Sequence, residues 1–113
     1  MPRQGPTGQL PLTIPVFQIL LSLADQDLHG YALIRDIERR TSGEVRLTAS
    51  TLYGAVARML ADSLIEELPA GLEDRRRCYR ITPAGRAVAR LEAERLARAA
   101  RWARQKRLLT GSP

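Results

Sequence analysis

Residues 48–82 read TASTLYGAVARMLADSLIEELPAGLEDRRRCYRIT, and this stretch decides the fold. It opens with hydroxyl-bearing residues that suit a helix start, and apolar residues then recur at helical spacing. Two short strand-like segments follow at residues 64–68 and 77–81, joined by a loop with Pro, Gly and successive arginines. This order is typical of a winged helix-turn-helix, in which one helix enters a DNA groove and the wing loop contacts phosphates. The inward positions expected on the helix are Leu52, Val56, Met59 and Leu60.

Two further helices are expected before this stretch. Thr13, followed by a proline in the first turn, suits the N-cap of a helix that ends near residues 25–28. The HGY sequence at residues 29–31 opens a second helix, for which Gly43 is the expected C-cap. This second helix and the helix of residues 48–63 form the predicted helix-turn-helix pair.

One long helix is expected after the second strand. Thr82 and Pro83 suit its N-cap and first position, and an alanine-rich sequence continues to about Leu109. The fold class is therefore mainly α with a small β-hairpin. The predicted organisation is a flexible arm (residues 1–11), a winged helix-turn-helix domain (12–83), a dimerisation helix (84–109) and a tail (110–113).

Composition favours a single small domain with a phosphate-bearing partner. The chain has 113 residues, is 44% hydrophobic and carries a formal net charge of +6. All basic residues except Lys106 are arginines, whose planar guanidinium suits phosphates and guanine edges. Charge alone does not separate DNA from RNA or an anionic membrane, and an arginine-rich genome would give the same bias.

The same sequence argues against several other classes of protein. Cys78 is the only cysteine, so neither an internal disulfide nor a cysteine-based zinc site is expected. The apolar run at residues 17–24 is too short to span a bilayer, so a cytoplasmic protein with no membrane partner is expected. Neither His29 nor Cys78 has a partner at a catalytic spacing, so we expect no enzyme, no metal and no cofactor.

The start of the helix at residues 48–63 supplies the candidates for DNA contact, since this part of a recognition helix meets base edges. For Thr48 and Ser50 the alternative is helix capping, and for Tyr53 it is packing on the domain. The candidates are Thr48, Ser50, Thr51, Tyr53, Gly54 and Arg58.

The wing supplies a second group of candidates, Arg75, Arg76 and Arg77. These arginines can neutralise phosphates, or one of them can enter a minor groove. Arg75 and Arg76 are favoured because they lie nearer the loop tip, and the acidic Glu73 and Asp74 beside them would limit nonspecific binding. The alternative is a solvated run of charge.

A seam of mostly small residues on the final helix indicates close contact with another helix. Pairing of two copies about a two-fold axis predicts two DNA-recognition helices roughly 34 Å apart and a near-palindromic DNA site. The alternative is that the helix packs back on its own domain. Trp102 on the same helix suits interface packing or the wall of a pocket for a flat ligand. The seam comprises Ala89, Ala93, Leu96, Ala100 and Ala103.

Four motifs of this sequence resemble the PadR family of bacterial transcriptional regulators, in particular its short members with one C-terminal helix. They are His29-Gly30-Tyr31 with Leu33 and Ile37; Ser50-Thr51-Leu52-Tyr53 with Leu60; Ser63-Leu64-Ile65; and Tyr79-Arg80-Ile81-Thr82-Pro83-Ala84-Gly85.

The resemblance implies a winged-helix homodimer that binds operator DNA, commonly as a repressor, with C-terminal helices in contact across the dimer. It implies DNA-facing roles for Tyr31 and residues 50–58, a wing at residues 75–77 and a dimer helix at residues 86–109. Many members have Pro or a bulkier residue where this chain has Ala49 and Ser50. Some short members bind planar compounds between the paired helices, and an aromatic residue there resembles Trp102.

The sequence thus predicts a sequence-specific DNA-binding regulator, a homodimeric repressor of PadR type with double-stranded DNA as partner and a small aromatic effector as a further candidate partner. The alternative is a winged-helix module that docks on an acidic protein and has no specific DNA binding. Salt dependence and sequence preference distinguish the two.

Overall fold

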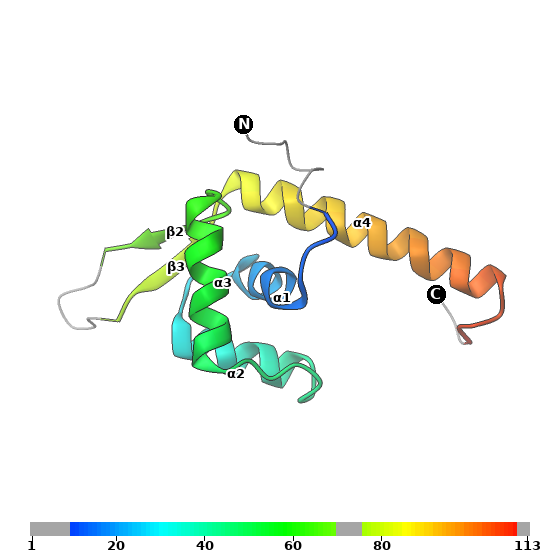
Figure 1. The fold of residues 1–113 in the computed structure, drawn as a ribbon, viewed down its shortest axis with the longest axis horizontal. Helices are drawn as coiled ribbons and strands as arrows, with labels where there is room; N and C mark the ends of the chain where they lie inside the picture. The colour runs from blue at the N-terminus through cyan, green and yellow to red at the C-terminus, as the bar shows by residue number, and fades with distance from the viewer. Residues whose placement is uncertain (1–9, 70–75, 111–113) are drawn as a thin grey trace.

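The computed structural model describes residues 10–69 and 76–110. Three helices form the body of the molecule, and a small sheet and a long final helix extend from it (Figure 1). The elements are α1 (Ile14–Leu23), β1 (Leu28–His29), α2 (Gly30–Arg40), α3 (Ala49–Ala61), β2 (Ile65–Leu68), β3 (Cys78–Ile81) and α4 (Pro83–Gln105).

Hydroxyl caps begin three of the four helices in the described part of the chain. The side chains of Thr13, Thr48 and Thr82 each accept a hydrogen bond from the backbone N–H three residues later. These bonds satisfy an N–H group that has no partner inside the helix. The predicted starts of α1, α3 and α4 are therefore confirmed.

Three of these helices end in the same way, and the ends of α2 and α4 differ from the prediction. In α2 the C-cap is Thr41 and not Gly43, because Ser42 takes the left-handed conformation with a φ of 53°. The N–H of Gly43 then bonds to the carbonyl of Glu38, which closes a Schellman turn. The left-handed residues after α3 and α4 are Ser63 and Arg107, so α4 stops at Gln105 and not near residue 109.

A third strand was missed by the sequence analysis, which predicted only a hairpin. Helix α1 ends at Leu23, earlier than the predicted residues 25–28, and Leu28 and His29 then pair with Tyr79 and Cys78 of β3. The antiparallel sheet has the order β1-β3-β2, with Ile65 opposite Ile81 across the wing. A strand of two residues is too short to give a periodic pattern.

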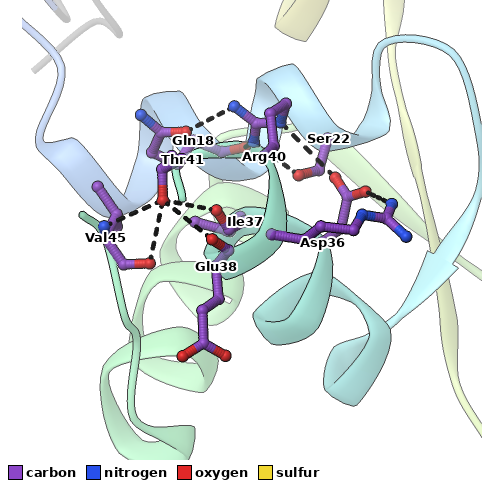
Figure 2. A network of polar contacts seen from close by, with 9 residues as sticks. Gln18, Ser22, Asp36, Ile37, Glu38, Arg40, Thr41 and Val45 are labelled. Atoms are coloured by element: carbon purple, nitrogen blue, oxygen red, sulfur yellow. Dashed lines mark hydrogen bonds and ion pairs between the residues drawn. The ribbon is translucent and has the colours of Figure 1, made fainter. Parts of the chain in front are cut away.

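Polar contacts join the end of α2 to α1 and shape the turn towards α3 (Figure 2). The Arg40 guanidinium donates to the side-chain oxygen of Gln18 at 2.8 Å and to the buried hydroxyl of Ser22 at 2.8 Å. The Thr41 hydroxyl donates to the Ile37 carbonyl and accepts from the Val45 N–H. These bonds hold the helix-turn-helix pair against α1.

The core lies where α1, α2, α3 and the sheet meet, and the first half of α4 covers α1. Four fully covered side chains from the three central helices are Leu20, Leu33, Ile37 and Leu52. The second half of α4 extends away from this body, as the orange end of the ribbon shows (Figure 1). No helix in residues 10–69 or 76–110 is long and apolar enough to cross a membrane.

Candidate nucleic-acid interface

Helix α3 has one buried and one exposed face. Leu52, Val56 and Met59 are buried, as the periodicity predicts, and Leu60 is half-buried against the core. Ser50 and Gly54 lie on the opposite, exposed face. Because the side chains on this face are small, they leave the helix backbone accessible, and another molecule can approach it closely.

Thr48 and Ser50 have different local roles. The Thr48 hydroxyl oxygen accepts the Thr51 N–H at 3.1 Å and is 3.1 Å from the Thr51 hydroxyl. Thr48 is therefore the N-cap, as the capping interpretation predicts, whereas Ser50 lies inside the helix that begins at Ala49. The side chains of Thr48, Ser50 and Thr51 are all exposed at the start of α3.

A cavity of about 240 Å³ opens between the start of α2, helix α3 and the base of the wing. Tyr31 and Tyr53 are 62% and 49% exposed there, and Arg76 and Arg77 provide positive charge. We call this cavity the tyrosine groove. Its lining residues are His29, Gly30, Tyr31, Tyr53, Arg76, Arg77 and Tyr79.

The buried Tyr79 forms the inner wall of the tyrosine groove. Burial raises the pKa of its phenol, and the nearby Glu67 carboxylate raises that pKa further. The phenol therefore stays neutral at physiological pH. Because Tyr79 pairs with both Leu28 and Glu67 across the sheet, it connects the wing to the start of α2.

The wing arginines that the structure describes are exposed. Arg77 lies 3.8 Å from the Glu67 carboxylate, a long separation for a pair in which both side chains are open to water. Arg76 also borders a second cavity, of about 440 Å³, beside α2. Arg75 lies outside the described residues, as do Glu73 and Asp74.

Arg58 is separated from the other candidates on α3. It borders a cavity of about 220 Å³ that Leu12, Thr13 and Asp62 also line, on the side of the domain where α1 begins. The tyrosine groove contains Tyr31, Tyr53, Arg76 and Arg77 but not Arg58.

Arg35 is a basic residue of this surface that the sequence analysis missed. Its guanidinium carbon lies 5.8 Å from the centroid of the Tyr31 ring, at a distance where a cation and an aromatic face attract each other. The i, i+4 spacing of Tyr31 and Arg35 on α2 was a signal for this contact. Arg35 and Arg76 line the same cavity, so the basic surface continues from the wing onto α2.

The predicted dimer seam lies on a partly exposed side of α4. Ala89 packs against the core, Ala93 is exposed, and Ala100 and Ala103 are half-buried. Leu96 is 41% exposed and Trp102 is 59% exposed. Large apolar side chains thus remain open to water on the part of α4 that extends from the body.

Within residues 10–69 and 76–110, no group of three or more His, Cys, Asp or Glu side chains is arranged to hold a metal ion. The one free thiol there, Cys78, is half-buried in β3 opposite Leu68 and His29.

Sequence comparison places the chain among regulators of transcription. Residues 19–98 match the family described as the transcriptional regulator PadR-like family. A transcriptional regulator of Mycobacterium tuberculosis is 38% identical over 71 residues, which are 62% of this chain and 64% of that protein. An uncharacterized 37.1 kDa protein in transposon Tn4556 of Streptomyces fradiae is 44% identical over 80 residues, 71% of this chain and 22% of that protein. The chain thus spans less than two thirds of either relative.

Solved structures agree with this placement. A transcriptional regulator from Clostridium thermocellum superposes with a TM-score of 0.73 at 28% identity, over 80% of this chain and 87% of that one. A PadR family transcription regulator from Clostridium difficile has the same fold, with a TM-score of 0.71 at 22% identity over 82% and 97% of the two chains. The chain therefore belongs to the transcriptional regulator PadR-like family.

Proposed function

We propose that the chain acts as a homodimer that binds a near-palindromic operator and represses transcription. The observation that carries the proposal is the tyrosine groove, where an exposed helix start meets two wing arginines. Helix α3 would lie in the major groove while the wing holds the sugar-phosphate backbone beside it. The protein would bind DNA in the cytoplasm.

The exposed face of α3 supplies the chemistry for reading DNA. The small residues Ser50 and Gly54 let the helix backbone come close to base edges, and the hydroxyls of Thr51 and Tyr53 can bond to bases or phosphates. The free N–H groups at the start of α3 favour a phosphate. Thr48 would act mainly through the cap that holds this helix end in shape.

The dimer would form through α4. The extended half of α4 carries Leu96 and Trp102, which the protomer leaves partly uncovered, and two such helices can cover each other. A two-fold axis between them would present two copies of α3 to successive major grooves roughly 34 Å apart. That geometry favours an inverted repeat as the operator.

A planar effector is a further part of the proposal, and exposed Trp102 motivates it. A flat ligand between paired α4 helices would lower operator affinity if it favours a dimer spacing that does not fit DNA. Titration of planar aromatic compounds should quench Trp102 fluorescence and weaken operator binding together. Ligand binding that leaves operator affinity unchanged would remove the effector from the proposal.

The first test of the proposal is selection of bound sequences from a random duplex DNA pool at near-physiological salt. We expect an inverted repeat with half-sites about one helical turn apart. A reporter gene placed behind that sequence should then lose expression when the protein is present. Absence of any enriched sequence would contradict specific DNA binding and would favour a protein partner for the basic surface.

The second test separates the wing from the recognition helix. Arg76→Ala should weaken binding to all sequences and reduce the slope of log affinity against log salt by about one, since one phosphate contact is lost. Ser50→Ala should instead change the preference among sequences. Arg90→Ala is the matched control, because it removes the same charge from an exposed position on α4. If the Arg76→Ala protein has the same DNA affinity and salt dependence as the control, the wing does not contact DNA through Arg76.

A further inference from the structure

Gly30 and Tyr53 approach each other more closely than any side chain at position 30 would allow. Gly30 is the first residue of α2, and Tyr53 comes from α3. A Cβ atom added to Gly30 would lie 2.3 Å from the Tyr53 hydroxyl oxygen, 2.7 Å from Cζ and 3.0 Å from Cε1. The outer end of the tyrosine ring therefore rests against the backbone of Gly30.

The backbone conformation does not require glycine at this position. Gly30 is the first residue of α2, and its φ is not in the left-handed region, so a residue with a side chain can adopt its backbone conformation. Gly30 is also buried, so flexibility at an exposed turn does not explain it. What glycine supplies here is the space that the Tyr53 ring occupies.

Tyr53 is at once held and available. One part of the ring lies on Gly30, and 49% of the residue is exposed beside Tyr31, Arg76 and Arg77. A phenol hydroxyl and guanidinium groups on one groove are donors that suit the phosphate oxygens of a DNA strand. The position of the ring therefore sets the shape of the tyrosine groove.

We propose that Gly30 is a positioning residue for DNA binding, because its missing side chain holds the Tyr53 ring where the tyrosine groove receives a phosphate of the operator. This inference rests on the proposed function. Gly30 itself need not touch DNA. A methyl group at position 30 would displace the Tyr53 ring, which is the movable end of an exposed side chain, and the fold would remain.

The test is a double-mutant cycle on operator affinity with the full-length chain. The four proteins are wild type, Gly30→Ala, Tyr53→Ala and the double variant. Gly30→Ala should lower affinity by about tenfold, the effect of losing one hydrogen bond to a charged phosphate. The same substitution should change affinity by less than about twofold when Tyr53 is already Ala, because no ring remains to be displaced. The double variant is thus the matched control.

The outcomes separate this inference from the proposed function. A wild-type protein without sequence-specific DNA binding contradicts the proposed function. A wild-type protein that binds its operator while Gly30→Ala binds equally well overturns the role of Gly30. The role of Gly30 is also overturned if the loss of operator affinity in the double variant equals the product of the losses in the two single variants. Gly30 would then act independently of Tyr53.

A second measurement follows the ring directly. The chain has three tyrosines, so a spectrum of tyrosine ring ¹³C–¹H pairs is simple to assign by substitution. Gly30→Ala should shift the Tyr53 signals strongly. The signals of buried Tyr79 should keep the dispersion of a folded protein, which reports that the domain has not unfolded. Unchanged Tyr53 signals would contradict the proposed contact.

Discussion

Gly54 and Gly85 are both helical glycines, but their surroundings differ. A Cβ at Gly85 would lie 2.0 Å from the Leu64 carbonyl oxygen, because the start of α4 packs against the backbone that leads into β2. A Cβ at Gly54 would meet nothing within 4 Å. The fold therefore requires glycine at position 85, whereas at position 54 a requirement can come only from a partner that approaches α3.

Gly54→Ala should raise stability and lower operator affinity. Alanine in the middle of an exposed helix is favoured by about 1 kcal/mol, and the added methyl group would lie between α3 and DNA. Thermal unfolding and DNA binding measure the two effects separately. Gly54→Gln should keep the helix and weaken binding further. Unchanged affinity in both variants would mean that DNA does not approach this face.

Gly85→Ala should destabilise the domain by about 1–3 kcal/mol, the usual cost of forcing a group into a packed site. The clash involves the Leu64 backbone, which cannot move without shifting the sheet. Urea unfolding measures the loss. Gly54→Ala is the control for helix propensity alone, because a Cβ there meets nothing within 4 Å, and a Gly85→Ala protein at least as stable as wild type would contradict the close packing.

At the scale of helices and strands, α4 is joined to the segment before α1 through a buried carboxylate. Glu92 is 2% exposed, and its Oε2 atom accepts the Leu12 N–H at 2.9 Å and an Arg95 N–H at 3.1 Å. The Arg95 hydrogen bond lowers the pKa of Glu92, burial opposes that shift, and the Leu12 N–H adds to it. The ionised form therefore stabilises the packing of α4 on α1.

Glu92→Gln should reduce the free energy of unfolding at pH 7 by about 1.5–3 kcal/mol, the range for hydrogen bonds to a charged group. Since the folded pKa lies below the ordinary value of 4.5, this stability is present above pH 4.5 and is lost as the pH falls through the folded pKa. The free energies of unfolding of the wild type and of Glu92→Gln should therefore become equal at acidic pH. Exposed Glu94→Gln on the same helix is the control, and an equal effect of both substitutions would contradict the role of Glu92.

At the scale of the whole molecule, the chain is more extended than its length requires. Its radius of gyration is 15.6 Å, compared with about 13 Å for a compact domain of this length. Helix α4 contributes to this extension, because its second half extends from the body (Figure 1). Leu96 and Trp102 on that half are partly exposed. Such a shape is favourable when a second molecule covers the extended helix.

Leu96→Glu should convert the proposed dimer into a folded monomer, because the charge would lie in the interface and outside the protomer core. Sedimentation velocity measures the mass, and operator affinity should fall more than about tenfold once the second half-site contact is lost. Leu108→Glu is the control, since Leu108 is exposed beyond the end of α4. If the Leu96→Glu protein has the same mass in solution as the wild type, this seam is not the dimer interface.

The sequence by itself determined the helices with strong caps and periodic apolar faces, and also the order of helix, wing and long final helix. These features depend on neighbours within a few residues, such as Thr48 with the Thr51 N–H or Thr82 with Gly85. Candidates such as Ser50 and Gly54 followed from their place near the start of the expected recognition helix. Their contacts with DNA remain predictions.

Only the tertiary structure decided the features that join distant segments. Strand β1 exists because Leu28 and His29 meet β3 about fifty residues later in the chain, and no local pattern encodes that pairing. In the sequence Glu92 resembles an ordinary surface residue, and only the tertiary structure brings the Leu12 N–H within hydrogen-bonding distance of its carboxylate. The contact between Gly30 and Tyr53 likewise depends on how α2 and α3 cross, because packing distances between helices are set by the whole core and not by either helix alone.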